Sequence, residues 1–385
     1  MLEHAKARLQ DLQDHMQGAG IDIALLTDES TIAYYAGFWG YLSVEFGRPT
    51  FLIVPAVGDS IVVTPLMESE MVAAMTWVPD VRTWEDSGPN NWDNVLAGIF
   101  GTLPTKLGVE QTVLPGLVRN WLESASDSME LEDVSPLIAK MRTVKSPFEI
   151  GIMKQAGMVA AAMMSSAQES LAEGVPEYES ALAVINAGTR AAANFLTAKG
   201  WEQFVSPMIY NLQIMQSGMD TSMVHRRASV KKLEAGDPVY FCFCNMAQFK
   251  QYKLGFDRMF NISHVSDQAA DVQQAAIDAQ QAALRVVRPG IAAEAVAEEA
   301  NEVYRDRGYA PSYRTGRSIG MAYLETPELK SGDVTVLQEG MTFAVDGGIS
   351  VDGQYGGRIG DSIVVTADGF EYLTEYPREV VVIDR

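Results

Sequence analysis

The sequence predicts an α+β protein built from two domains, one at residues 1–143 and one at residues 144–385. The chain has 385 residues, which is more than one ordinary hydrophobic core fills. Its first part alternates helix-like and strand-like segments, which indicates a mixed sheet flanked by helices. From Ser146 onward, two pairs of helices alternate with two pairs of strands. This doubled unit predicts one curved antiparallel sheet with a concave face.

The N-terminal domain begins with a helix-like segment and continues with strands. Residues 1–17 carry charges every few positions and form an amphipathic helical pattern that ends near Gly18. An apolar run follows at 21–28, and residues 51–65 form a strand-like segment bent as a hairpin at Gly58. The alternation continues with a helix over 67–75, a strand over 105–111 and a helix over 114–125.

The C-terminal domain opens with a pattern typical of a capped helix. Pro147 occupies a first-turn position, and the helical pattern then runs without a breaker to Gly174. A second helix is expected from Glu177. Residues rich in β-branched and aromatic side chains predict two strands of one sheet at 238–244 and 249–263. The predicted order ends with helices over 266–287 and 292–307 and strands over 340–350 and 358–366.

The charge and composition exclude several classes of partner. The net charge is −21 and there is no run rich in Lys and Arg, so we do not expect nucleic acid as a partner. The N-terminus lacks the apolar core of a secretory signal, and no apolar run approaches the roughly 20 residues of a membrane span. The only cysteines are Cys242 and Cys244, which are badly placed to bridge each other. These features predict a reduced, cytoplasmic protein.

Five strings resemble, in order and spacing, the C-terminal domain of the creatinase and aminopeptidase P family. They are KSPFEIGIMKQAG, KKLEAGDPVYF, YRTGRSIG, LQEGMTFAVDGGIS and GGRIGDSIVVT. The layout of the N-terminal domain is similar to that family too, so the resemblance covers nearly the whole chain. It implies the family's "pita-bread" fold, with a creatinase-like N-terminal domain before a catalytic domain.

The resemblance also implies where a metal site would be. Metal-dependent peptidases of this family hold two divalent ions with two Asp, one His and two Glu. The matching positions here carry other residues, namely Cys242, Gly255, Arg317, Asp346 and Gly360. At most two of these could bind a hard divalent ion, and an arginine adds a fixed positive charge among them. We therefore expect no catalytic metal and no cofactor.

Members that work without a metal, such as creatinase and ectoine hydrolase, are the nearest in pattern. The string SGMDTSMVHRRASVKKLEAGD resembles creatinase around its catalytic histidine, which matches His225. A Glu-Arg pair that grips the guanidinium of creatine matches Asp257 and Arg258. Its second guanidinium-binding glutamate matches Asp346. The resemblance thus implies that His225, Asp257 and Asp346 are catalytic and that Arg258 binds substrate.

Further substrate contacts follow from the same resemblance. In creatinase the partner subunit supplies a Phe-x-Arg, and Phe46 and Arg48 repeat this pattern, which implies a homodimer with shared active sites. A second carboxylate-binding arginine is missing from the loop after Gly320, and Arg317 is expected to replace it. Two residues near the matched strands, Cys242 and Tyr252, are expected to line the same pocket.

The residue types themselves support this chemistry. A hydrolase without a metal needs a general base, and histidine has an unperturbed pKa close to the operating pH. His4 and His15 fall in the N-terminal helix and His264 at a helix start, which leaves His225 in a loop that enters the sheet. Two facing carboxylates suit a planar cation with several donors, such as a guanidinium or amidine.

Simpler interpretations of these residues stay open. Asp346 precedes two glycines and could only form a turn, and Asp257 with Arg258 could be a plain ion pair. The two cysteines are most simply small buried residues. A rebuilt site for one soft or borderline metal ion is a further possibility. Its ligands would come from His225, Cys242, Asp257, Asp346 and Asp361.

The sequence therefore predicts a metal-independent hydrolase of a C–N bond in a small zwitterionic guanidino or amidine compound. Four different functions stay open beside it. The protein could open a cyclic amidine as ectoine hydrolase does, or cleave another small zwitterionic osmolyte by hydrolysis or elimination. It could also be a metal-dependent Xaa-Pro peptidase-like enzyme, or a non-catalytic binding protein on this scaffold.

Overall fold

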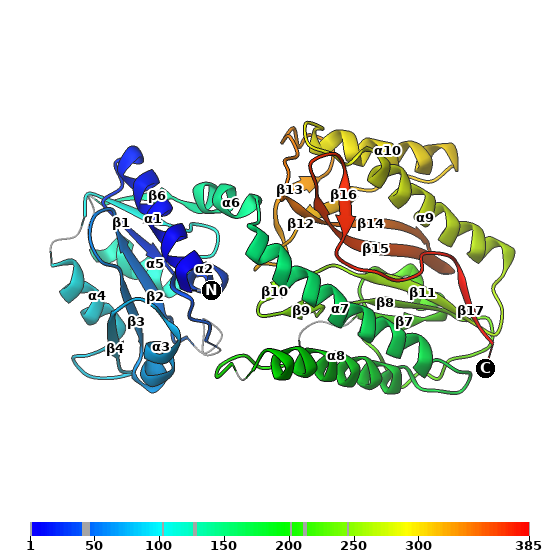
Figure 1. Ribbon diagram of the computed structural model, residues 1–385, viewed down its shortest axis with the longest axis horizontal. Helices are drawn as coiled ribbons and strands as arrows, with labels where there is room; N and C mark the ends of the chain where they lie inside the picture. The colour runs from blue at the N-terminus through cyan, green and yellow to red at the C-terminus, as the bar shows by residue number, and fades with distance from the viewer. Residues whose placement is uncertain are drawn as a thin grey trace. The chain divides into compact units, whose positions relative to one another are not determined.

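A computed structural model describes residues 2–40, 47–101, 104–125, 129–200, 202–210, 214–244 and 246–384. The chain divides into two compact units, Met1–Met141 and Arg142–Arg385. The domain boundary expected at residue 143 lies two residues from this division. Figure 1 shows the strands and helices of each unit.

Within the described residues, the first unit contains a mixed sheet of six strands in the order β4-β3-β2-β1-β5-β6. The predicted hairpin at residues 51–65 is present as two antiparallel strands, and Gly58 lies between them with a φ of 109°. The β1 strand pairs in parallel with β5, which makes the sheet mixed as predicted. The strands are β1 (Ile23–Leu26), β2 (Phe51–Pro55), β3 (Ile61–Pro65), β4 (Asp80–Trp84), β5 (Lys106–Val109) and β6 (Glu130–Asp133).

Helices accompany this sheet, and apolar side chains from both form its core. Buried residues of the strands, including Leu25, Phe51 and Val63, pack with Leu96 of α4 and Leu122 of α5. The helix expected at 67–75 begins with a 3-10 turn, η2 (Leu66–Glu68). The α-helices are α1 (Leu2–Ala19), α2 (Glu29–Ala36), α3 (Ser69–Met75), α4 (Trp92–Phe100), α5 (Gly116–Ala125) and α6 (Ser135–Thr143), which crosses into the second unit.

The second unit contains the predicted antiparallel sheet, and its described part has nine strands. Seven follow the order β13-β12-β14-β15-β11-β8-β7, while β16 pairs with β15 and β17 pairs in parallel with β11. The strands are β7 (Ile214–Ser217), β8 (Pro238–Cys242), β11 (Asp257–Ile262), β12 (Gly316–Ser318), β13 (Glu325–Leu329), β14 (Thr342–Val351), β15 (Tyr355–Val365), β16 (Phe370–Tyr372) and β17 (Val381–Ile383).

One strand prediction needs correction. Residues 249–263 do not form a single strand of the large sheet. They begin in a separate hairpin, β9 (Gln248–Phe249) and β10 (Tyr252–Lys253), and enter the large sheet only at Asp257. The turn between β9 and β10 has positive φ at both Lys250 and Gln251, a conformation that their side chains do not announce in the sequence.

Two pairs of long helices pack on this sheet and its hairpin (Figure 1). They are α7 (Pro147–Ser170) with α8 (Glu177–Lys199), and α9 (Asp267–Val286) with α10 (Ala293–Asp306). α7 starts at Pro147 as expected, and Ser146 and Glu149 form a capping box there. α9 lies directly on β14 and β15, where a Cβ at Gly347 would stand 2.0 Å from the carbonyl oxygen of Ala276.

No helix in the described part of the chain is long and apolar enough to cross a membrane.

Candidate active site

Four residues form one row across the sheet of the second unit. Cys242 on β8 pairs with Asp257 on β11, Asp257 pairs with Gly360 on β15, and Gly360 pairs with Asp346 on β14. Residues that pair directly in a sheet project from the same face. The row therefore brings together Asp257 and Asp346, the two carboxylates that the sequence assigned to one site, with Cys242 beside them.

Asp257 is buried among polar groups that contact each of its oxygens. The hydroxyl of Tyr240 donates to its Oδ2 at 3.0 Å, and the thiol of Cys244 lies 3.8 Å from its Oδ1. The residue is 6% exposed. Burial, and secondly the negative charge of Asp346, raise the pKa of Asp257 to about 6. A carboxyl group with this pKa can carry a proton near neutral pH.

The carboxylate of Asp346 is divided between two environments. Its Oδ2 accepts a hydrogen bond from Nη1 of Arg317, whereas its Oδ1 is buried without a hydrogen-bond partner among the described residues. A Cβ added to Gly360 would stand 2.9 Å from this Oδ1 and 2.9 Å from Oδ2 of Asp257. Because both oxygens lie 2.9 Å from the same point, they are less than about 6 Å apart. They face each other across Gly360, which has no side chain.

Arg317, on β12, places a positive charge beside these carboxylates. Its Nη2 lies 3.4 Å from the Sγ of Cys244, and its guanidinium carbon lies 4.3 Å from the centre of the Tyr323 ring. Its Nε is buried with no partner in the described part of the chain. Burial alone lowers the pKa of this guanidinium, but the nearby acidic groups, Asp346 first among them, together raise it above its ordinary value.

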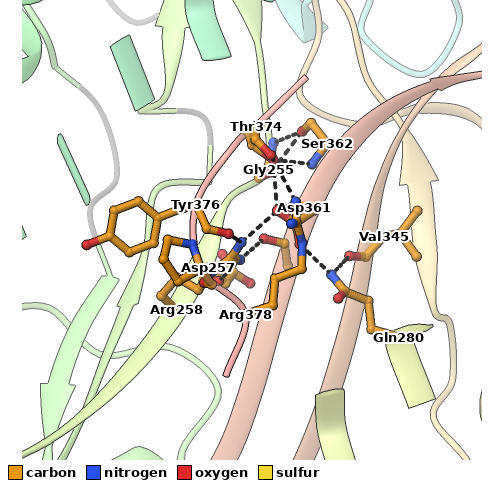
Figure 2. Close-up of polar contacts among 12 residues, drawn as sticks. Gly255, Asp257, Arg258, Gln280, Val345, Asp361, Ser362, Thr374, Tyr376 and Arg378 are labelled. Carbon is orange, nitrogen blue, oxygen red and sulfur yellow. Dashed lines mark hydrogen bonds and ion pairs between the residues drawn. The ribbon is translucent and has the colours of Figure 1, made fainter. Parts of the chain in front are cut away.

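Asp361, which lies next to Gly360 on β15, faces the other side of the sheet. Figure 2 shows Arg258 and Arg378 converging on its carboxylate, together with Gln280 and Thr374. The Nη2 of Arg258 donates to Asp361 at 2.8 Å. Asp361 is fully buried and both of its carboxylate oxygens accept hydrogen bonds. This group therefore stabilises the sheet on the face opposite the candidate site.

The placement of Arg258 does not fit the substrate-binding role expected from the sequence. Successive residues of a strand point to opposite faces, so Arg258 points away from the side chain of Asp257. Its guanidinium makes five hydrogen bonds, to Asp361 and to the carbonyl groups of Asp257, Gly360, Tyr376 and Pro377. An arginine has five N–H donors, so these contacts use its full capacity. Arg258 instead joins β11 to β15 and to the segment after β16.

Tyr252 is also placed away from the row of carboxylates. It lies in the β9–β10 hairpin, and its hydroxyl donates to Oε1 of Glu149, on α7, at 3.0 Å. The hydroxyl of Tyr252 is thus engaged with α7, and the substrate contact expected for this residue stays a prediction. Arg48 lies in the first unit, where it forms an ion pair of 2.6 Å with Asp86. Phe46 lies outside the described residues.

His225 is exposed, in the loop between the 3-10 helix η3 (Gly218–Ser222) and β8. The carbonyl of the next residue, Arg226, accepts a hydrogen bond of 3.2 Å from the backbone N–H of Met215, so the loop returns along β7 at the edge of the sheet. Within the described residues, His225 makes no hydrogen bond with Asp257 or Asp346. The structure thus unites the two carboxylates and leaves the predicted base at the adjoining edge.

A buried carboxylate holds the loop that carries His225. Glu177, at the start of α8, accepts hydrogen bonds from Ser217 at 2.7 Å, from Arg226 at 3.0 Å and from the backbone N–H of Ser229 at 2.8 Å. These partners stand on both sides of His225. Although burial alone raises the pKa of Glu177, these hydrogen bonds and Arg226 hold it below its ordinary value. Glu177 is therefore a charged anchor for the loop.

Three residues of the site were missed by reasoning from the sequence. Tyr240 precedes Cys242 by two positions on β8, so the period of a strand could have placed it on the same face. Cys244 was expected within the strand 238–244, but β8 ends at Cys242, so Cys244, like Tyr323, lies outside the strands. They reach the site only because the chain folds back there, Cys244 toward Asp257 and Tyr323 toward Arg317.

The second unit, with its curved antiparallel sheet and two helix pairs, defines a pita-bread fold. Residues 151–367 match the model of the metallopeptidase family M24, and residues 8–144 match that of the creatinase/prolidase N-terminal domain. The chain belongs to family M24, a family of hydrolases. The predicted family and the predicted fold are both confirmed.

Named relatives share most of this chain's length. The agropine synthesis cyclase of Rhizobium rhizogenes is 27% identical over 384 residues, which are 96% of each chain. The creatinase of Bacillus sp. (strain B-0618) is 27% identical over 97% of this chain and 91% of its own. Among solved structures, the recombinant prolidase from Thermococcus sibiricus has a TM-score of 0.85 at 25% identity and covers 98% of both chains.

The name of the family implies a metal, but the residues present do not fit a pair of ions. A Cβ at Gly255 would stand 2.6 Å from the Cβ of Ala344 and 3.0 Å from Nη2 of Arg317. The guanidinium thus borders the position of one expected ligand, and Gly360 leaves a second position without a donor. With these two glycines and an arginine, the site lacks the several hard donors that each divalent ion needs.

A smaller cluster remains that could hold a single ion. The ligand atoms of Cys242, Cys244 and Asp257 all lie within 4.8 Å of one another. However, the guanidinium of Arg317 lies within hydrogen-bond distance of Cys244 and opposes a second positive charge there. Of the five residues considered for a rebuilt metal site, only Cys242 and Asp257 belong to this cluster. Asp361 faces the opposite side of the sheet, and His225 lies at its edge.

Proposed function

We propose that this protein is a metal-independent hydrolase that cleaves a C–N bond in a small zwitterionic compound with a guanidino or amidine group. The observation that carries the proposal is the pair of carboxylates in one row, Asp257 and Asp346, beside the buried guanidinium of Arg317. This arrangement offers acceptors for a cation and a donor for an anion within one site.

The cationic end of the substrate would bind between the two carboxylates. Oδ2 of Asp257 and Oδ1 of Asp346 lie less than about 6 Å apart, and a nitrogen between them could lie about 2.9 Å from each. Oδ1 of Asp346 is buried and accepts no hydrogen bond from the described residues. A buried acceptor without a donor is costly, so a donor supplied by the substrate would stabilise this arrangement.

The anionic end of the substrate would bind to arginine. The buried Nε of Arg317 has no acceptor among the described residues and is a donor available to a carboxylate or carbonyl oxygen. In the homodimer that we propose, Phe46 and Arg48 of the partner subunit close the same site. In this isolated chain Arg48 is paired with Asp86, so substrate binding would have to compete with that ion pair.

The proposed reaction is an addition followed by an elimination. His225 takes a proton from water as the oxygen adds to the trigonal carbon of the substrate. The C–N bond then breaks, and the leaving nitrogen receives a proton from His225 or from protonated Asp257. With a guanidino acid the products are urea and an amine, so one water is consumed per turnover. The carboxyl groups of Asp257 and Asp346 keep the cationic group oriented during both steps.

The test is a turnover assay with chelator-treated protein and a panel of guanidino and amidine acids. We expect urea or amine to be released at a rate that chelator does not change. His225→Ala should lower turnover at least about 100-fold while substrate binding, measured by calorimetry, changes little. A His225→Ala protein with wild-type turnover would remove His225 as the base. Restoration of turnover only by a divalent metal would contradict the metal-independent reaction.

Ring closure is a second candidate function. A relative named for cyclisation, the agropine synthesis cyclase, matches 96% of this chain. Arg317 also neutralises Asp346 already, which favours a substrate with less positive charge than a guanidino acid. Mass spectrometry separates the possibilities, because hydrolysis adds one water whereas condensation to a ring removes one.

The same assay distinguishes four further activities by their products. Opening of a cyclic amidine yields one product heavier by a water, and elimination yields an unsaturated acid. A prolidase-like reaction releases proline from a dipeptide, and a binding protein shifts its melting temperature with no product. The panel therefore includes ectoine, betaine-like osmolytes and proline dipeptides.

A further inference from the structure

The guanidinium of Arg317 stands where several groups would otherwise repel one another. Asp257 and Asp346 face each other across Gly360, and Cys244 contacts both Asp257 and Arg317. A carboxylate that is buried without a counter-charge is strongly destabilising. Arg317 is 2% exposed and is the cation bonded to Asp346, so it is an integral part of this cluster.

Gly255 makes room for this large cation, and Gly360 makes room for the two carboxylates. A side chain at Gly255 would meet Nη2 of Arg317 at 3.0 Å and the Cβ of Ala344 at 2.6 Å. A side chain at Gly360 would meet the carboxylates of Asp257 and Asp346. Neither glycine can supply a metal ligand. A side chain at Gly255 would also approach the guanidinium of Arg317.

The contacts of Arg317 fix the orientation of its guanidinium and involve Nη1 and Nη2 but not Nε. Nη1 donates to Asp346, Nη2 lies beside Cys244, and the ring of Tyr323 covers the guanidinium at 4.3 Å. Nε has no acceptor among the described residues, although it is buried. A fixed N–H with no protein acceptor can stabilise negative charge that develops on a bound substrate.

We propose that the guanidinium of Arg317 is the permanent cation of this site and supplies the electrostatic stabilisation that metal ions supply in a metallopeptidase. Its Nε–H, which has no acceptor among the described residues, donates to the carboxylate or carbonyl oxygen of the bound substrate. This role rests on the proposed function only in assuming that the site is catalytic. The replacement of a metal by a resident guanidinium can be tested without any substrate.

The experiment uses the full-length Arg317→Ala protein and three probes. This variant keeps both carboxylates but removes their cation. Guanidinium chloride at about 20 mM is far below denaturing concentrations, and urea is a neutral probe of the same planar shape. We expect guanidinium to raise the melting temperature of Arg317→Ala by at least about 2 °C, with no rise from urea. The wild-type protein should respond to guanidinium less than Arg317→Ala does, because Arg317 already pairs with Asp346, and MnCl2 should not stabilise it.

The matched control is the double variant Arg317→Ala with Asp346→Asn, in which the effect of guanidinium should shrink because the counter-charge is gone. Equal effects of guanidinium and urea on Arg317→Ala would show that charge is not what the site lacks, and would overturn the proposal. Stabilisation of the wild type by MnCl2 would also overturn it, because a metal would then bind alongside Arg317.

A second variant covers the case in which Arg317→Ala does not fold. Arg317→Lys keeps the charge and should fold, whereas Arg317→Met, with similar length and no charge, should melt at a lower temperature than Arg317→Lys. Equal melting temperatures for these two variants would contradict the proposal. All these readouts are independent of turnover, so their failure is distinguishable from failure to find a substrate.

Discussion

Asp257 has a carboxyl group that is 6% exposed and lies close to the negative charge of Asp346. Both features disfavour its ionised form in the folded protein, and its pKa rises to about 6. Tyr240 compensates in part by donating a hydrogen bond at 3.0 Å. The same burial that makes Asp257 suitable for proton transfer therefore reduces the stability of the protein at neutral pH.

At pH 8, the free energy of unfolding of Asp257→Asn is expected to be about 1–3 kcal/mol higher than that of the wild type. The folded pKa of about 6 lies above the usual 3.8, so the folded protein retains a proton that the unfolded chain releases. Wild-type stability should thus fall as the pH rises from about 4 to about 6, and the variant should lack this fall. Urea unfolding across this pH range measures both slopes. Parallel slopes would contradict the role assigned to Asp257.

At the scale of elements, helix α7 approaches the backbone after β16 through a glycine. A Cβ at Gly157 would stand 1.6 Å from the carbonyl oxygen of Leu373, closer than non-bonded atoms can approach. Gly151, on the same helix, is exposed and has nothing within 4 Å of its added Cβ. Substitution of the two glycines can therefore distinguish the effect of helix propensity, at Gly151, from the effect of packing, at Gly157.

Gly157→Ala is expected to lower the free energy of unfolding by more than about 2 kcal/mol, because α7 must move away from Leu373. Gly151→Ala should instead raise it by about 0.5–1 kcal/mol, since alanine favours a helix over glycine. Denaturant unfolding of both variants measures the contrast. Similar effects from the two substitutions would mean that α7 does not pack at Gly157 as described.

At the scale of the whole molecule, buried ion pairs connect the first residues of the second unit to strand β13 of its sheet. Lys145, just before α7, lies 2.9 Å from Glu325 on β13, and Arg142 contacts the same carboxylate. Burial alone raises the pKa of Glu325, but these two cations lower it to about 2. The start of the second unit is thus anchored to β13, which lies at the opposite end of the strand order from β7.

Mixing two inactive variants tests the proposed homodimer. If Arg48 of the partner subunit completes each site, Arg48→Ala and His225→Ala should each lose activity, but a mixed dimer contains one intact site. Random exchange of subunits should then restore about a quarter of the wild-type activity. The assay is turnover after co-refolding, with each variant refolded alone as its control. Activity no greater than that of the separate variants would exclude a shared site.

Much of the fold could be predicted because its elements follow from local patterns. The start of α7 at Pro147, the hairpin bend at Gly58 and the two long helix pairs lie where the sequence indicated. The β9–β10 hairpin could not be predicted, since its turn uses positive φ at Lys250 and Gln251, which are ordinary residues for a strand-like run. Alternation along a strand could have shown that Arg258 faces away from Asp257.

The sequence by itself determined the family and the order of elements, because strings of residues and periodicity are local properties. The resemblance to the family implied that Asp257 and Asp346 share one site. Only the tertiary structure decided that Arg317 bonds to Asp346 and contacts Cys244, that Arg258 is used entirely within the sheet support, and that Glu177 anchors the loop of His225. These contacts join residues far apart in the chain. Their formation depends on strand register and on distances of about 3 Å, which sequence spacing does not specify.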